Sequence, residues 1–134
     1  MCQAMFSRPE LSGVLNLDTH ILEFALDDSL TPVERKLLSA YQRGVSAIVL
    51  WEIAKLRQLG RLALDVRSTE CKRVLARGHV WPLDVVVCAK STELDFSSDP
   101  ADELIAATSI VHNAPLVTRD RKIKKSKLVP FARL

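Results

Sequence analysis

Acidic side chains follow three predicted strands of this 134-residue chain, and two more acids open a predicted buried helix. These acids are Asp18, Glu52, Asp99, Asp102 and Asp120. Several anions in one crevice raise one another's pKa and destabilise a fold unless a cation binds among them. Oxygen ligands without cysteine or histidine suit the hard cations Mg²⁺ and Mn²⁺. Such ions can hold a phosphodiester and activate a water molecule, so the sequence predicts metal-dependent phosphodiester hydrolysis.

Each acid also has a structural alternative when it is considered by itself. Asp18 can form a turn, and Glu52, expected in the first turn of a helix, is favoured there by the helix dipole. Asp99 can cap a helix with Asp102 as its capping partner, and Asp120 can be a solvated loop residue. The chemical interpretation therefore depends on the elements that bring the acids together.

Those elements alternate between strand-like and helix-like segments, which predicts an α/β domain whose mostly parallel sheet is covered on both faces. Strands are expected at 14–17, 45–48, 80–83, 115–118 and 128–131. Helices are expected at 20–26, 32–44, 49–60, 68–76, 84–94 and 100–112. The third strand is expected at an edge because Pro82 cannot donate a ladder hydrogen bond, and the last is expected on the outside. Ligand sites of parallel sheets lie beyond the carboxyl ends of the strands, so at least three of the acids should meet there.

The starts of two helices are the most clearly marked boundaries. Thr31 and Asp99 are each followed by a proline at the first helical position and by an acid three residues after the cap. This is the pattern of a capped helix N-terminus with proline at its first position. The second of these starts places Asp102 in the first turn of its helix.

Basic residues are concentrated in the C-terminal segment. The formal net charge of the chain is +3, whereas the segment from Thr118 to the end carries +6, with seven basic residues against Asp120. Six basic residues of this segment are candidates for binding a polyanion such as RNA: Arg119, Arg121, Lys122, Lys124, Lys125 and Lys127. Basic patches attract nucleic acids through counterion release. A solvated charged loop is an equal alternative.

The length and a hydrophobic content of 48% indicate one globular domain rather than a disordered chain. We expect residues 1–13 to be a loose extension and 14–134 to form the domain. The odd number of cysteines, three, predicts free thiols rather than disulfides or a zinc site. Because no apolar stretch is long enough to span a membrane, we expect a cytoplasmic protein.

Five segments, taken in chain order, resemble one known family. They are 17–20 (LDTH), 45–54 (VSAIVLWEIA), 60–62 (GRL), 99–108 (DPAD and LIAAT) and 116–121 (LVTRDR). Together they make residues 14–131 similar to the PIN-domain family, and most similar to the toxin nucleases of bacterial VapBC toxin-antitoxin pairs. The resemblance implies a three-layer α/β/α fold with a mostly parallel sheet of about five strands. It also implies metal-dependent endoribonuclease activity.

The resemblance further implies a role for particular residues. The family's acidic cluster matches Asp18, Glu52, Asp102 and Asp120, and Asp99 matches a position that is often acidic. Hydroxyl groups that support the acids match Thr19 and Thr118, for which plain backbone hydrogen bonding is an equal alternative. Family members are usually homodimers that a cognate antitoxin neutralises, so both partners are expected here.

Several residues have weaker functional interpretations. We expect His20 to be structural, and Trp51 to be buried in the core or an interface rather than to stack on a base. Four leucines face either a partner or the core: Leu56, Leu59, Leu62 and Leu64.

Two other functions compete with the nuclease. One is a non-catalytic module that binds RNA or protein through the basic segment. The other is an α/β phosphatase with Asp18 as nucleophile, but this chemistry generally uses an acid two residues later, where His20 stands.

Overall fold

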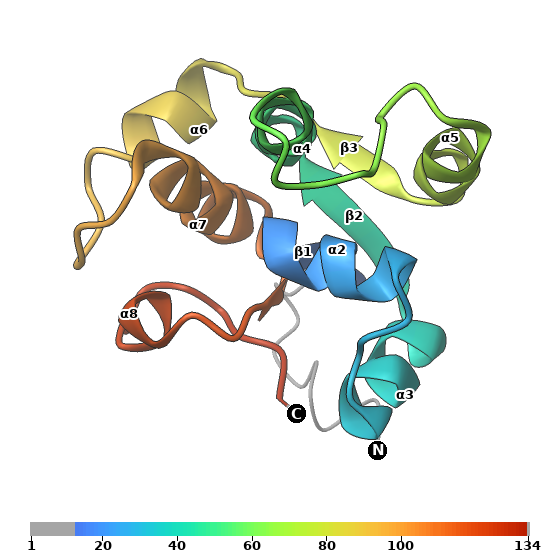
Figure 1. Cartoon of the computed structure of the whole chain (residues 1–134). Coiled ribbons are helices and arrows are strands. Elements are labelled where there is room, and N and C mark those ends of the chain that lie inside the picture. The colour runs from blue at the N-terminus through green and yellow to red at the C-terminus, as the bar shows by residue number, and fades with distance from the viewer. Residues whose placement is uncertain (1–12, 134) are drawn as a thin grey trace.

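The computed structural model describes residues 13–133, and the predicted extension lies almost entirely outside them. The four strands are β1 (Val14–Leu17), β2 (Gln42–Ser46), β3 (His79–Trp81) and β4 (Leu116–Val117). The helices are α2 (Thr19–Leu26), α3 (Pro32–Ala40), α4 (Ala47–Gln58), α5 (Thr69–Ala76), α6 (Val85–Lys90), α7 (Pro100–His112) and α8 (Arg121–Lys124). Helices flank the sheet, with α5 and α8 at its opposite ends (Figure 1). None of the helices within 13–133 is long and apolar enough to cross a membrane.

The sheet has the strand order β3-β2-β1-β4, and each neighbouring pair is parallel. This arrangement confirms the predicted α/β class and the edge position of β3. The expected fifth strand at 128–131 contributes only one parallel bridge, between Leu116 and Phe131. Pro130 has no N–H group with which to continue a ladder there. Because all four strands run in one direction, their carboxyl ends lie along the same edge of the sheet.

Several predicted boundaries are wrong by a few residues around β2. The strand covers 42–46 rather than 45–48, and α3 stops at Ala40 rather than near Gly44. Ser46 ends the strand because its hydroxyl caps α4 by accepting a hydrogen bond from the N–H of Ile48 at 3.4 Å. The helix therefore starts at Ala47, and Glu52 lies in its second turn rather than its first.

The core joins the two central strands to α7. Leu15, Val45 and Ile105 are buried together in it. The buried side chain of Asn16 donates from Nδ2 to the carbonyl of Ile105 at 3.1 Å and to Ser109 Oγ at 2.9 Å. Since a buried polar group is costly without partners, these bonds fix α7 against β1. The helix that carries Asp102 is thereby held beside β1, the strand that Asp18 follows.

Candidate active site

Asp18 is the first residue after β1 and the N-cap of α2. Its carboxylate accepts a hydrogen bond from the N–H of Ile21 at 2.9 Å, and its other oxygen accepts one from the hydroxyl of Thr118. The residue is only 6% exposed. Asp18 thus joins the carboxyl ends of β1 and β4.

Glu52 reaches the same edge from α4. Its carboxylate accepts a hydrogen bond from the hydroxyl of Thr19, which directly follows Asp18 in the chain. The side chain is half-buried. The two threonines that the sequence singled out therefore each donate to one of the acids.

Asp102 lies in the first turn of α7 and accepts a hydrogen bond from Ser98 Oγ at 2.8 Å. Asp99 is exposed, and its side chain makes no capping hydrogen bond. It is Glu103 that accepts from the N–H of Ser98, at 3.2 Å. Asp99 occupies the N-cap position of α7, but the capping pair with Asp102 that was the structural alternative is absent, so side-chain capping does not account for either acid.

Asp120 follows β4 and caps α8, where it accepts hydrogen bonds from the N–H groups of Lys122 at 2.8 Å and Ile123 at 3.3 Å. Its own N–H donates to Thr118 Oγ1 at 3.0 Å. The hydroxyl that binds Asp18 is thus also bound to the backbone of Asp120, which makes Thr118 the link between these two acids.

The electrostatics place Asp102 among the other acids. Burial is the largest cause of the raised pKa of Asp18 and of Glu52, and the negative charge of Asp102 raises both further. Burial likewise raises the pKa of Asp102, with added contributions from the charges of Asp120 and Asp99. These acids, from four separate segments, are therefore close enough to repel one another.

A cleft of about 270 Å³ opens beside this cluster. It is lined by Asp18, His20, Phe24, Arg119 and Asp120. His20 is exposed, and its proximity lowers the pKa of Asp18, Glu52 and Asp102 against the larger effect of burial. The cleft gives Asp18 and Asp120 access to solvent and to a ligand.

The six basic residues proposed from the sequence to bind RNA are all exposed, and they divide into two groups. Five of them lie on or beside α8: Arg121, Lys122, Lys124, Lys125 and Lys127. Arg119 instead forms a two-pronged ion pair with Glu34, with donor-acceptor distances of 2.6 and 2.8 Å. The solvated loop considered for this segment is in part a short helix, because Asp120 caps it.

A family model described as the PIN domain matches residues 16–127. The chain belongs to the PIN-domain family. Ribonuclease VapC22 of Mycobacterium tuberculosis is 33% identical to this PIN domain over 92 residues, which make up 66% of this chain and 70% of VapC22.

Solved structures of low sequence identity share the fold of this PIN domain. The crystal structure of VapBC2 from Rickettsia felis bound to a promoter DNA fragment matches with a TM-score of 0.71 and 18% identity, covering 90% of this chain and 98% of that one. The crystal structure of FitAcB from Neisseria gonorrhoeae matches with a TM-score of 0.66 and 21% identity, covering 89% of this chain and 96% of that one. A toxin-antitoxin complex from Klebsiella pneumoniae matches with a TM-score of 0.62 and 20% identity, covering 81% of this chain and 88% of that one.

The donor chemistry of this PIN domain fits Mg²⁺ or Mn²⁺, because its clustered side chains offer carboxylate oxygens whose repulsion a cation would relieve. In residues 13–133, however, no three acidic, histidine or cysteine side chains are grouped closely enough to hold a metal ion as they stand. The structure thus supplies the acids and their mutual repulsion, and the coordination of a metal is a proposal.

Other expectations for the PIN domain have mixed outcomes. The side chain of Trp51 is not in the core, because the residue is 54% exposed on α4. Leu62 and Leu64 pack against the core, whereas Leu59 is 64% exposed. Cys71 and Cys88 are free thiols.

Three further residues contribute to the site, and the sequence alone did not indicate their contributions. Ser98 binds Asp102, Glu34 binds Arg119, and Asn16 fixes α7 against β1. Asn16 was visible as a polar residue within an apolar strand. Nothing in the local sequence pattern signals the partners of Ser98 and Glu34, since each partner is defined only by the fold.

Proposed function

We propose that this PIN domain is a Mg²⁺- or Mn²⁺-dependent endoribonuclease that acts as the toxin of a toxin-antitoxin pair. The observation that supports it best is that Asp18, Glu52 and Asp102 repel one another at the edge where the parallel strands end. The relationship to a protein named ribonuclease VapC22, at 33% identity, supports RNA as the substrate.

In this proposal the acids hold the cation. The ligands are Asp18, Glu52, Asp102 and Asp120, with Asp99 as a further acid beside Asp102. A bound divalent cation lowers the pKa of a water molecule and stabilises charge on the leaving oxygen. The hydroxyl groups of Thr19, Thr118 and Ser98 orient the carboxylates by donating to them. Removing a hydrogen bond that orients a metal ligand commonly lowers metal affinity or activity by about 10- to 100-fold.

RNA is held by the exposed basic residues on and beside α8. These are Arg121, Lys122, Lys124, Lys125 and Lys127. They lie next to Asp120, where positive charge offsets the repulsion between the acids and a phosphate backbone. Arg119, adjacent to them in sequence, differs from them because its guanidinium is bound to Glu34.

The partners we propose are a cognate antitoxin and a second copy of the chain, and the location is the cytoplasm. Solved structures that share the fold include a toxin-antitoxin complex. Apolar side chains that are more than half exposed, among them Trp51, Leu59 and Val85, offer surface that an interface could cover.

Replacing Asp102 by Asn tests the function. We expect metal-dependent cleavage of RNA to fall at least 100-fold, because the central anion of the cluster is lost while its size and its hydrogen bond to Ser98 can be kept. Glu103→Gln is the matched control, since it neutralises the next acid of α7 while its amide oxygen can still accept from the N–H of Ser98, and it should cleave at the parent rate. Cleavage products are measured by gel electrophoresis, with and without EDTA.

The proposal is wrong if Asp102→Asn cleaves as well as the parent, or if the parent cleaves fully in EDTA. A non-catalytic module predicts a different outcome, in which the parent binds RNA without cutting it and loss of the acid has no effect on binding.

A further inference from the structure

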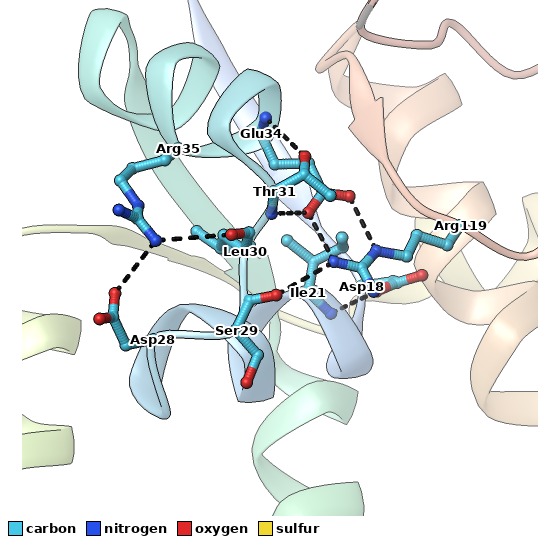
Figure 2. Close-up of polar contacts among 9 residues, drawn as sticks. All are labelled: Asp18, Ile21, Asp28, Ser29, Leu30, Thr31, Glu34, Arg35 and Arg119. Carbon is cyan, nitrogen blue, oxygen red and sulfur yellow. Dashed lines mark hydrogen bonds and ion pairs between the residues drawn. The ribbon is translucent and has the colours of Figure 1, made fainter.

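Arg119 and Glu34 form the most closely fitted ion pair among the described residues. Arg119 Nε donates to Glu34 Oε2 at 2.8 Å and Nη2 donates to Oε1 at 2.6 Å (Figure 2). Glu34 is only 3% exposed, so its carboxylate depends on this partner for compensation. Arg119 lowers the pKa of Glu34 to about 2, so the pair is charged throughout the neutral range.

Glu34 is itself fixed at the start of α3. Its carboxylate accepts from the N–H of Thr31 at 2.9 Å, and its own N–H donates to Thr31 Oγ1 at 3.1 Å. This reciprocal arrangement is a capping box, which ties the side chain to the helix N-terminus. One carboxylate therefore serves both the helix cap and the arginine.

Arg119 is held on a second side by α2. Its guanidinium carbon lies 4.0 Å from the centre of the Phe24 ring, and Nη2 also donates to the carbonyl of Ser29 at 3.4 Å. Cation-π contacts and a planar two-pronged carboxylate bond restrict the guanidinium in both position and orientation. Arg119, the residue between Thr118 and Asp120, is thus anchored to both α2 and α3.

We propose that Arg119 is a positioning residue, and that its pair with Glu34 holds the segment 118–120 so that Thr118 reaches Asp18 and Asp120 faces Asp102. This inference rests on the proposed nuclease function. The pair acts on the acids only through the backbone of 118–120, so it should govern how well they bind a cation together. It assigns Arg119 a different task from the exposed basic residues of α8.

The sequence suggested instead that Arg119 binds RNA, and the two roles predict different behaviour of Glu34. If Arg119 positions the acids, losing either partner has the same effect, and losing both adds little. If Arg119 contacts RNA, Glu34→Gln frees the guanidinium and preserves or strengthens RNA binding, whereas Arg119→Gln weakens it.

The experiment uses the full chain with Glu34→Gln, Arg119→Gln and the double variant. The controls are Asp28→Asn and Arg35→Gln, which remove an exposed ion pair of 3.4 Å from the same α2–α3 region (Figure 2). Mn²⁺ affinity is measured by electron paramagnetic resonance, and kcat and KM by RNA cleavage in Mg²⁺. RNA affinity is measured without metal.

We expect each single variant and the double variant to weaken Mn²⁺ binding by a similar factor of about 10 and to lower kcat, with KM and metal-free RNA affinity unchanged. Arg119→Lys, which keeps the charge but not the two-pronged geometry, should not restore Mn²⁺ binding. The control variants Asp28→Asn and Arg35→Gln should have the Mn²⁺ affinity, kcat, KM and RNA affinity of the parent. If Arg119→Gln does not fold, Arg119→Lys and Glu34→Gln carry the same comparison.

Parent-like Mn²⁺ binding in Glu34→Gln, or a rise in KM confined to the Arg119 variants, would overturn the positioning role. Asp102→Asn, measured alongside, separates this failure from failure of the proposed function. If Asp102→Asn loses Mn²⁺ while the pair variants keep it, only the positioning role is wrong. If Asp102→Asn also keeps it, the nuclease assignment is wrong.

Discussion

Asp102 interacts electrostatically with each of the other four acids, Asp18, Glu52, Asp99 and Asp120. Its own charge raises the pKa of Asp18 and Glu52, and its pKa is raised by Asp120 and Asp99, in each case after the larger effect of burial. A carboxyl group whose pKa is raised by folding stabilises the fold when protonated and costs stability when ionised. The cost grows as the pH rises through the pKa of the folded state.

Asp102→Asn should therefore stabilise the metal-free protein at neutral pH. We expect the free energy of unfolding at pH 7.5 to rise by about 0.5–1 kcal/mol, a modest value because solvent screens this half-buried group. The gain should shrink as the pH falls through the raised pKa of Asp102, because its carboxyl group is then protonated and no longer repels the other acids. Urea unfolding in EDTA at several pH values measures this, with Glu103→Gln as control. A loss of stability at pH 7.5 would contradict the repulsion.

Among single residues, the sequence predicted which acids lie near one another, but it predicted only some of the residues that hydrogen-bond to them. Asp18 and Asp120 could be found because each follows an apolar strand, and the structure joins both through Thr118. Ser98 and Glu34 could not be found, since their partners lie in space rather than in a local pattern. The ion pair of Arg119 could not be found for the same reason, because the charge of Arg119 is visible in the sequence and its partner Glu34 is not.

The short helix α8 is the element that presents basic residues beside the acids. Asp120 caps it, so one residue belongs both to the acidic cluster and to the start of the basic helix. Lys124, Lys125 and Lys127 are exposed at its end and just beyond it. This is a suitable arrangement for holding a phosphate backbone next to the site.

Replacing Lys124, Lys125 and Lys127 by Ala should weaken RNA binding and reduce the slope of log affinity against log salt by about 2, since each phosphate contact contributes about 0.7 to 0.9. Fluorescence anisotropy over a range of salt concentrations measures the slope. The control replaces Lys72, Arg73 and Arg77, exposed residues in and after α5 at the other end of the sheet. Equal slopes for both triple variants would make α8 an ordinary charged surface.

Element boundaries were predicted less well than element types. The start of α4 at Ala47 depends on the Ser46 cap, which an apolar run from 45 to 50 conceals. The strand at 128–131 was expected from its composition, yet Pro130 limits it to one bridge. In both places a single hydrogen-bonding group decides where the element ends, and hydrophobic patterning does not detect such groups.

Across the whole molecule, the parallel order β3-β2-β1-β4 brings distant acids to one edge. The alternation of strands and helices was sufficient to predict this, because parallel strands require crossovers of fixed hand and place all their carboxyl ends together. Asn16 then sets the position of α7, and hence of Asp102, against β1. The parallel direction of the strands was predictable from the sequence, whereas their number and order and the packing of α7 needed the three-dimensional structure.

A cation that binds only the folded protein stabilises it by mass action. At a concentration one hundred times the dissociation constant, Mn²⁺ should add about 2.7 kcal/mol to the free energy of unfolding of the parent. Differential scanning fluorimetry across an Mn²⁺ titration should show a saturating rise in Tm for the parent and for Glu103→Gln. The rise should be absent in Asp102→Asn.

The most direct test of the account is Mn²⁺ binding to the full chain in the absence of RNA, measured by electron paramagnetic resonance. We predict saturable binding of one or two ions by the parent, and its loss when Asp18 or Asp102 is replaced by Asn. No saturable binding by the parent, or equal binding by the parent and both variants, would contradict the claim that these acids form a metal site.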